Sequence, residues 1–444
     1  MPTNDTIAAI ATPPGIGGIG IVRISGPQAL EIGNTLTDTK LQNYRVRFRK
    51  FLDASNQTLD HGLCFYCQAP HSFSGEDVVE IQGHGGPILL DMLLERVCEL
   101  GARLAYAGEF SQRAFLNGKI DLAQAESIAD LIESGSRAAA KAAMRSLEGR
   151  FSDQIHQVAD DIIALRAYIE AALDFAEEEI DFLADNSIDD RLALCRSNVE
   201  KILQQAEHGR VLNEGLALTL AGLPNAGKSS LLNHLAGYEA AIVTEIEGTT
   251  RDVLREHISL NGIPIQVNDT AGLRESDNPV EIEGIKRAWQ EVDKSDAVLL
   301  LVDATIGLSA VHEPIIERLK NNNYHLVYTK SDLLTEAAQK DPDALYISTI
   351  SGEGFDQLID VITGSLSNYS ADDQSIMARR RHVEAIKNAH DCLQQAQEIF
   401  KDSQSGELVA EDLRLAQQYL NEITGEFTSD DLLGNIFSKF CIGK

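Results

Sequence analysis

Residues 222–229 have the residue types and the spacing of a phosphate-binding loop. They read Gly-Leu-Pro-Asn-Ala-Gly-Lys-Ser and fit the pattern G-x-x-x-x-G-K-S/T. An apolar run precedes them and helical sequence follows from Ser230, which is the expected strand–loop–helix context. We expect backbone N–H groups to turn onto phosphate oxygens, Lys228 to neutralise the β- and γ-phosphates, and the Ser229 hydroxyl to ligate Mg²⁺.

Three later segments could complete a nucleotide site. Residues 269–272 match D-x-x-G, so Asp269 would reach Mg²⁺ through a water molecule and the N–H of Gly272 would sense the γ-phosphate. Thr250 lies in a polar loop, where a switch threonine would complete the Mg²⁺ shell. Residues 329–332 resemble the pattern N-K-x-D, whose Asp accepts hydrogen bonds from guanine N1–H and the 2-amino group. Adenine lacks those donors, so the sequence favours GTP over ATP.

Position 329 departs from this pattern, because Thr stands where N-K-x-D has Asn. The Asn amide normally braces the loop, whereas Thr supplies only a hydroxyl. We expect somewhat weaker guanine binding without loss of specificity. Residues 348–350, Ser-Thr-Ile, stand where a backbone loop would contact guanine O6, and they match the usual Ser-Ala-Lys only in part.

The pattern of apolar and polar residues along the chain predicts the elements that must position these motifs. Residues 1–118 mix short β-branched runs with helical sequence. Residues 212–372 alternate apolar runs with helical stretches, which indicates a mainly parallel, doubly wound sheet. Residues 119–211 and 373–444 are amphipathic helical sequence. We therefore expect an α/β multidomain protein in which the second α/β segment is inserted into an all-α helical domain.

Composition and charge exclude several classes of protein. The 444 residues include 38 Lys and Arg against 68 Asp and Glu, a formal net charge of −30. This argues against a stand-alone DNA or RNA binder and against attachment to an anionic membrane. No apolar run could span a membrane, residues 1–14 lack the features of a secretory signal, and six cysteines are too sparse for a disulfide framework. We expect a cytoplasmic protein that binds neither membrane nor DNA.

Further blocks are more specific than any single phosphate-binding loop. They are residues 5–15 with Arg-Ile-Ser-Gly at 23–26, Phe-Ser-Gly-Glu-Asp at 73–77 with Gly-His-Gly-Gly-Pro at 83–87, Asn-Gly-Lys-Ile-Asp-Leu at 117–122, Gly-Thr-Thr-Arg-Asp at 248–252, and Phe-Cys-Ile-Gly-Lys at 440–444. With these blocks the whole chain resembles the MnmE (TrmE) family of bacterial tRNA-modification GTPases.

The resemblance implies a domain plan and an activity. It implies an N-terminal tetrahydrofolate-binding and dimerisation domain at 1–118, a helical domain in two halves at 119–211 and 373–444, and an inserted Ras-like P-loop G domain at 212–372. It also implies a homodimer that forms a heterotetramer with the FAD-binding MnmG protein, which would hold most of the tRNA. Together they would add a carboxymethylaminomethyl or aminomethyl group at C5 of the wobble uridine of certain tRNAs. The one-carbon unit would come from a 5,10-methylene or 5-formyl tetrahydrofolate, and GTP hydrolysis would drive G-domain dimerisation and conformational change.

The motifs do not support the Ras-type mode of hydrolysis. Leu273 follows D-x-x-G where Ras-type proteins carry the Gln that positions the attacking water, and Leu cannot do so. Arg251 and Arg274 are candidate arginine fingers that could equally be structural. The resemblance implies instead a potassium ion beside the β- and γ-phosphates, with Glu281 orienting the attacking water. The implied potassium ligands are the Asn225 side chain and the backbone carbonyls of Thr244, Ile246 and Thr249.

The complete set of candidate nucleotide residues combines the motifs with the implied switch loop. It comprises Asn225, Ala226, Gly227, Lys228, Ser229, Ser230, Thr244, Glu245, Ile246, Glu247, Gly248, Thr249, Thr250, Asp269, Thr270, Ala271, Gly272, Thr329, Lys330 and Asp332. Ser229 and Thr250 are the candidate magnesium ligands, and Lys228 and Glu281 are the candidate catalytic residues for hydrolysis.

A folate site in the N-terminal domain is implied by the resemblance. Its candidate residues are Arg23, Glu80, Lys119 and Lys444. A carboxylate can accept pterin N–H donors, and cations can hold the glutamate tail. Without the resemblance, Arg23 would be interpreted as a surface cation. Cys441 is a candidate catalytic thiol that would need a lowered pKa, and a structural role in the C-terminal segment is the alternative.

Other features have plainer interpretations. The C-x-x-C at 64–67 lies on an alternating strand without a second pair at zinc spacing, so we interpret both cysteines as strand residues. The acidic stretch at 174–190 is interpreted as a solvated helix end and loop. His84 is either a turn residue or a ligand contact, and the basic cluster at 379–381 is either a helix-start surface or a tRNA contact.

Two other functions remain open on the sequence. One is a regulatory G protein, for instance in ribosome assembly, which would need neither a folate domain nor a terminal Cys-Ile-Gly-Lys. The other is a folate-dependent one-carbon transferase with a degenerate nucleotide module. The intact Lys228, Ser229, Asp269 and Thr250 weigh against the second.

Overall fold

The computed structural model describes residues 5–174, 187–238, 255–260, 263–269, 279–320, 322–334, 341, 344–364, 375–403, 405–426, 430–438, 440 and 443. The chain divides into two compact units. The first consists of Met1–Ile132, Met144–Ile202 and Glu384–Lys444, and the second of Glu133–Ala143 and Leu203–Val383.

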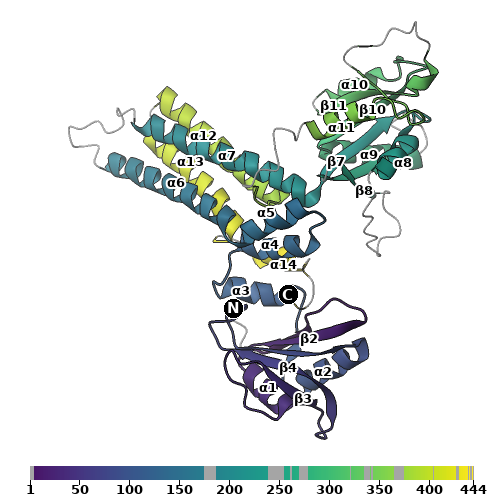
Figure 1. Ribbon diagram of the computed structural model, residues 1–444. Helices are drawn as coiled ribbons and strands as arrows, with labels where there is room; N and C mark the ends of the chain where they lie inside the picture. Colours follow the sequence, from purple (N-terminus) through teal and green to yellow (C-terminus); the bar gives the residue numbers. More distant parts are fainter. Residues whose placement is uncertain are drawn as a thin grey trace. The chain divides into compact units, whose positions relative to one another are not determined.

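The first unit begins with a six-stranded sheet of order β3-β4-β5-β2-β1-β6. Neighbouring strands are antiparallel except β1 and β6, which are parallel. Helices α1 (Ala29–Thr37) and α2 (Pro87–Glu99) cover one face (Figure 1), because Ile32 and Leu93 share one core with Val22 of β2. The strands are β1 (Ile7–Ile10), β2 (Gly17–Ser25), β3 (Arg47–Leu52), β4 (Thr58–Cys67), β5 (Val78–Gly85) and β6 (Arg103–Leu104).

Strand β4 shows why this sheet buries one face. Its side chains alternate between buried and more exposed, as the period of two in a strand requires. Cys64 is fully buried and Cys67 is half-buried on that strand, as predicted for the C-x-x-C, and burial raises the pKa of the Cys64 thiol. Among the described residues no group of three or more His, Cys, Asp or Glu could hold a metal ion. His84, predicted as a turn residue or a ligand contact, lies within strand β5, and its Nδ1 lies 2.7 Å from the Asp60 carboxylate.

Helices from distant parts of the sequence pack together in the first unit (Figure 1). α6 (Arg150–Asp174) lies against α13 (Gly406–Thr424), where Arg166 Nη1 donates to Gln417 Oε1 at 2.9 Å. Gly425, with φ +90°, ends α13 in the left-handed conformation that glycine adopts without strain. The other helices that precede or follow the second sheet in the sequence are α3 (Glu109–Leu116), α4 (Leu122–Glu133), α5 (Arg137–Leu147), α7 (Ser187–Glu214), α12 (Arg380–Ser403) and α14 (Asp430–Phe437). Of these, α4, α5, α7 and α12 have residues in both compact units.

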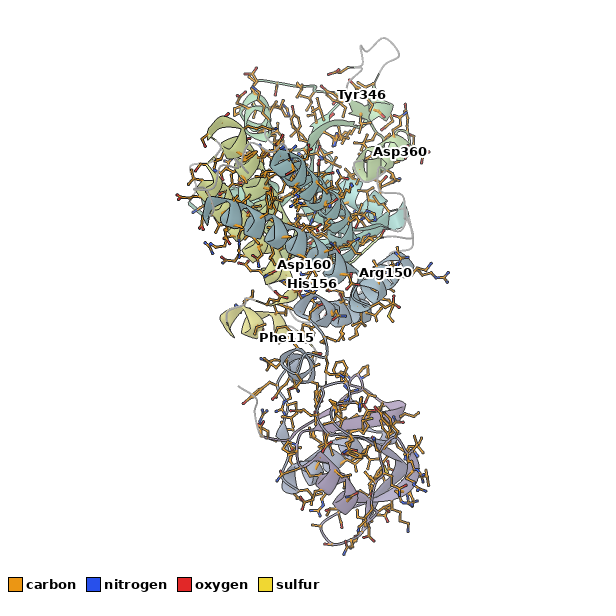
Figure 2. All side chains as sticks on the ribbon, turned by 90° about the vertical axis from the view of Figure 1, so that its left-hand side faces the viewer. Phe115, Arg150, His156, Asp160, Tyr346 and Asp360 are labelled. Carbon is orange, nitrogen blue, oxygen red and sulfur yellow. The ribbon has the colours of Figure 1, made fainter. Side chains whose placement is uncertain are left out.

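A small core joins α3 and α4 to the C-terminal segment. Leu122 of α4 and Phe437 of α14 are buried in it, and the ring of Phe115, labelled in Figure 2, lies 6.4 Å from that of Phe437. Gly108 precedes α3 with φ +67°, and a Cβ there would lie 2.5 Å from the Phe437 carbonyl oxygen. Only glycine fits this approach, so the C-terminal segment is fixed beside the start of α3.

The second unit contains a six-stranded sheet of order β12-β11-β10-β7-β9-β8, parallel except for β8, which runs antiparallel to β9. Both faces are covered, because Leu299 and Leu301 of β10 pack in one core and Val298 and Leu300 in another. α8 and α11 contribute to the first core, and α9 and α10 to the second. The elements are β7 (Leu216–Gly222), β8 (Arg255–Leu260), β9 (Ile263–Asp269), β10 (Ala297–Asp303), β11 (Tyr324–Thr329), β12 (Leu345–Tyr346), α8 (Lys228–Tyr238), α9 (Pro279–Lys294), α10 (Glu313–Leu319) and α11 (Phe355–Gly364).

The fold class agrees with the sequence prediction. The apolar runs near 216–221, 263–267, 298–303, 325–328 and 344–347 form β7, β9, β10, β11 and β12. Strand β8 was not predicted, because a strand–loop–helix pattern does not specify a strand that pairs antiparallel with the strand after it.

Candidate functional site

The phosphate-binding loop links the C-terminal end of β7 to the N-terminus of α8. Gly222 ends the strand with φ +147°, and a Cβ there would lie 2.5 Å from the carbonyl oxygen of Leu301, so glycine is required. Asn225 and Gly227 also have positive φ, +65° and +95°, which turns the backbone of the loop. Lys228 Nζ donates to the carbonyl oxygens of Gly222 at 2.9 Å and Leu223 at 3.1 Å. The result is a turned glycine loop, a helix N-terminus and a cation held together, which suits a polyphosphate.

Thr329 does part of what the usual Asn would do. Its side chain is buried at the end of β11, and its hydroxyl donates to the carbonyl oxygen of Ala226 at 2.8 Å. This hydrogen bond braces the phosphate-binding loop against the guanine-reading segment. Weaker guanine binding at this position stays a prediction.

The rest of the guanine-reading segment is held by charged and polar contacts. Lys330, with φ +60°, places its Nζ 2.6 Å from Asp303. Ser348 Oγ donates to Asp332 Oδ1 at 2.5 Å. Ser348 of the Ser-Thr-Ile segment at 348–350 therefore orients the candidate guanine-binding carboxylate of Asp332.

Replacing Thr329 by Val should weaken GDP binding about tenfold, because the carbonyl of Ala226 would lose its donor and a buried unsatisfied group costs about 1–3 kcal/mol. Fluorescence titration with a labelled GDP measures the change in Kd. Thr329→Ser, which keeps the hydroxyl, is the matched control and should bind as the wild type does. Equal affinity of the Val and Ser variants would contradict the bracing role.

The remaining nucleotide candidates are placed only in part. Asp269 ends β9 directly opposite Leu220 of β7, so the backbone at the start of D-x-x-G lies beside the phosphate-binding loop. Ser229 and Ser230 are exposed in the first turn of α8. The predictions for residues 244–250 and 270–272 lie outside the described residues, as do those for the side chains of Asp269 and Glu281.

A second cluster lies in the sheet of the first unit. Arg23 of β2 is directly opposite Glu80 of β5, and Arg23 Nε donates to Glu80 Oε1 at 2.8 Å. Their side chains are only 20% and 14% exposed, so Arg23 is a half-buried, paired cation and not a surface cation. Arg23 Nη1 also donates to the carbonyl oxygen of Gly443 at 3.3 Å. Two predicted folate residues and the C-terminal segment thus meet at one place, while Cys441 and Lys444 lie outside the described residues.

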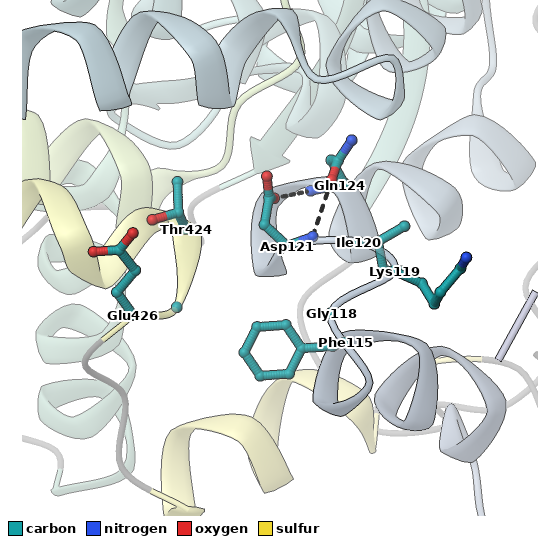
Figure 3. A pocket seen from close by; sticks show the side chains of 9 residues that line it. Phe115, Gly118, Lys119, Ile120, Asp121, Gln124, Thr424 and Glu426 are labelled. Atoms are coloured by element: carbon teal, nitrogen blue, oxygen red, sulfur yellow. Dashed lines mark hydrogen bonds between the residues drawn. The ribbon is translucent and has the colours of Figure 1, made fainter. Parts of the chain in front are cut away.

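Lys119 is a third predicted folate residue. Its Nζ donates to the carbonyl oxygen of Pro70 at 3.1 Å, in the loop that joins β4 to β5. Lys119 also lines an open pocket of about 280 Å³, and Figure 3 shows its side chain directed away from Thr424 and Glu426 on the other wall. The other lining residues are Phe115, Gly118, Ile120, Asp121, Gln124 and Gly425.

The pocket wall opposite Thr424 is the N-terminus of α4. The Asp121 N–H donates to Gln124 Oε1 at 2.9 Å, and the Gln124 N–H donates to Asp121 Oδ1 at 2.8 Å (Figure 3). These reciprocal bonds cap the helix. The Asn-Gly-Lys-Ile-Asp block therefore has a structural role in addition to the one predicted for Lys119.

An ionic network centred on the buried Arg113 and Glu109 was not predicted from the sequence. Arg113 of α3 contacts Asp5, Glu76 and Glu109 at 2.8, 3.1 and 3.0 Å, and Arg103 contacts Asp5 and Glu109. Burial by itself would raise the pKa of Glu109, but hydrogen bonds from Arg103, the Tyr106 N–H and Arg113 outweigh it and hold that pKa below its usual value. The only signal in the sequence was a Glu–Arg pair four residues apart on a short helix.

Comparisons with known proteins identify the family of the chain. The family model "GTP-binding protein TrmE N-terminus" matches residues 6–119, and "MnmE helical domain" matches residues 122–441. The tRNA modification GTPase MnmE of Legionella pneumophila (strain Corby) is 51% identical over 451 residues, covering 99% of each chain. The tRNA modification GTPase MnmE of Pseudomonas fluorescens (strain Pf0-1) is 50% identical and covers 99% of this chain and 99% of its own. The tRNA modification GTPase MnmE of Acinetobacter baylyi is 52% identical and covers 100% of this chain and 98% of its own.

The chain belongs to the MnmE family of tRNA modification GTPases. The resemblance inferred from the sequence is confirmed. The protein is accordingly a GTP hydrolase that acts in tRNA modification, and GTP is its nucleotide substrate.

Membership of the MnmE family decides between the alternatives. A regulatory G protein that lacks a TrmE-type N-terminal domain is excluded by the match over residues 6–119. Among solved structures, Era from Aquifex aeolicus is 23% identical and covers 40% of this chain and 66% of its own, at a TM-score of 0.28, so the family assignment depends on the sequence matches alone. In the part of the chain that the structure describes, every helix is too short or too polar to cross a bilayer.

Proposed function

We propose that this MnmE-family protein delivers a one-carbon unit from a tetrahydrofolate derivative to C5 of the wobble uridine of certain tRNAs, together with an FAD-binding MnmG partner. The product is a carboxymethylaminomethyl or aminomethyl group. The observation that carries the proposal is the meeting of Arg23, Glu80 and the Gly443 carbonyl at one half-buried place in the sheet domain.

The residues present fit a reduced folate of the 5,10-methylene or 5-formyl type. Such a ligand has a ring with several N–H donors and an anionic glutamate tail. The Glu80 carboxylate can accept from the ring, and cationic Lys119 and Lys444 can hold the tail. Cys441, two residues before Gly443 in the sequence, is the thiol that would take part in the carbon transfer.

The phosphate-binding loop fits a magnesium ion and a potassium ion beside GTP. The Ser229 hydroxyl at the start of α8 and Thr250 would hold Mg²⁺. Asn225 is exposed in the loop with φ +65°, so its side chain can reach a cation together with the carbonyls of Thr244, Ile246 and Thr249. A monovalent cation there would stabilise charge that develops on the phosphates, and Glu281 would orient the water that Leu273 cannot.

GTP turnover in K⁺ and in Na⁺ tests the cation proposal. We expect hydrolysis to be about 10²-fold faster in K⁺, the size of effect seen when one preorganised electrostatic group is lost. Asn225→Ala should remove the difference and leave GTP binding nearly unchanged. Equal rates in both salts with the wild-type protein would falsify the potassium mechanism.

The carbon-transfer proposal is tested on cellular tRNA. Mass analysis of tRNA nucleosides from cells that lack this protein should show loss of the modified wobble uridine, restored by the wild-type chain. Normal modification in the deleted cells would exclude the proposed role.

The partners follow from the charge of the chain. At a formal net charge of −30, the protein is poorly suited to hold tRNA by itself. We propose that it works in the cytoplasm as a homodimer within a heterotetramer, with MnmG carrying most of the tRNA contact. The domain plan 1–118, 119–211, 212–372 and 373–444 is part of this proposal.

A further inference from the structure

Two aromatic rings lie near the guanidinium of Arg23. Its central carbon lies 5.7 Å from the ring centre of Phe73 and 5.7 Å from that of Phe110, both within cation–π range. Phe110 is fully buried, whereas 40% of Phe73 is exposed. The paired cation therefore has one buried aromatic neighbour and one aromatic neighbour that is partly exposed.

The exposure of Phe73 does not come from a loose loop. The next residue, Ser74, is fully buried, and its Oγ lies 2.6 Å from Ser25 Oγ. Asn117 Nδ2 donates to the Ser74 carbonyl oxygen at 2.8 Å, and Glu76 is paired with Arg113. The loop thus holds the Phe73 ring beside Arg23 at a defined place.

The chemistry beside this ring is that of a site for a flat, hydrogen-bonding molecule. The Glu80 carboxylate, 14% exposed, is paired with Arg23 through one oxygen, and its other oxygen has further acceptor capacity. An aromatic face next to an acceptor suits a conjugated ring whose edge carries N–H donors, because the face stacks while the edge donates.

We propose that Phe73 stacks on the ring system of the reduced folate and so determines affinity for it. The inference rests on the proposed folate function and adds a ligand-contacting residue to that site. Arg23 is then a positioning residue, which orients both Glu80 and Phe73.

Binding of 5-formyltetrahydrofolate to the full-length protein, measured by equilibrium dialysis, tests this stacking. Phe73→Ala and Phe73→Leu should each weaken binding about tenfold, whereas Phe73→Tyr, which keeps the ring, should bind as the wild type does. Phe48→Ala is the matched control, because Phe48 is 63% exposed on β3 of the same sheet, and its affinity should not change. Thermal unfolding and sedimentation of each variant show whether its fold and its oligomeric state are retained.

The outcomes separate this inference from the function on which it rests. If the wild-type protein does not bind the folate, the proposed folate function fails and the stacking fails with it. If the wild type binds the folate and either Phe73→Ala or Phe73→Leu binds it equally well, the stacking role is overturned while the folate function stands. Loss of affinity that follows a change in oligomeric state would assign Phe73 to a subunit interface and overturn the proposal.

Discussion

Replacement of Lys228 by Ala should lower the rate of GTP hydrolysis by about 10²- to 10³-fold, the cost of removing one preorganised group that stabilises transition-state charge. The structure holds Lys228 Nζ against the carbonyl oxygens of Gly222 and Leu223, at 2.9 and 3.1 Å. The ammonium is thereby positioned before GTP arrives, so little reorganisation is needed when charge develops on the phosphates. Phosphate release under single-turnover conditions with saturating GTP measures the effect.

Lys320→Ala is the control for this variant, because Lys320 ends α10 in the same unit and its side chain is 59% exposed. It should hydrolyse GTP at the wild-type rate. Lys228→Arg should also be impaired, since a planar guanidinium does not replace a compact ammonium at a close phosphate contact. If GTP hydrolysis drives the tRNA reaction, nucleosides from cells with only Lys228→Ala will lack the wobble modification. Near-wild-type hydrolysis by Lys228→Ala would remove Lys228 from the catalytic role.

The nucleotide site was predictable where one contiguous segment carries the chemistry. Residues 222–229 specify a strand end, a turned loop and a helix start, and the structure has these elements in the same order. The effect of Thr at position 329 was not predictable, because its hydroxyl bonds the carbonyl oxygen of a residue 103 positions away. Whether a different polar side chain preserves this hydrogen bond depends on where the partner atom lies, and the sequence does not give that position.

The sheet-domain site was predictable only through the family resemblance. Arg23 and Glu80 are 57 residues apart, and Arg23 and Gly443 are 420 residues apart, so no local pattern joins them. Charged residues in an acidic chain are interpreted as surface residues by default, which is why the network around Arg113 was missed. Burial of these groups is decided by which strands and helices pack together, and that information is not local.

Replacing Arg113 by Met should destabilise the first unit by about 3–5 kcal/mol, the usual cost of removing one partner from a buried ion pair. Arg113 is 5% exposed and faces three carboxylates, of which Glu109 is 7% exposed. Met fills a similar volume, so loss of charge and hydrogen bonds is the main change. The free energy of unfolding from urea titration measures the effect.

Arg414→Met is the matched control for this substitution. Arg414 forms an i,i+3 pair with Glu411 at 2.8 Å, but both side chains are about half exposed. Because exposed pairs contribute only about 0–1 kcal/mol, this variant should unfold almost as the wild type does. Equal destabilisation by the two substitutions would contradict the assignment of the Arg113 network as a buried structural core.

The dependence of stability on pH provides an independent test of the network. Contacts with Arg103 and Arg113 hold the pKa values of Asp5 and Glu109 below their usual values of 3.8 and 4.5, although burial by itself would raise them. A carboxyl whose folded-state pKa is lowered stabilises the fold above its unfolded pKa and loses that contribution as pH falls through the folded value. Wild-type stability should therefore drop below about pH 4.5, and Arg113→Met, which is already less stable at pH 7, should show a smaller drop over the same range. A drop of the same size in both proteins would mean that other carboxyls control acid unfolding, because the favourable interaction of Asp5 and Glu109 with Arg113 exists only while they are ionised.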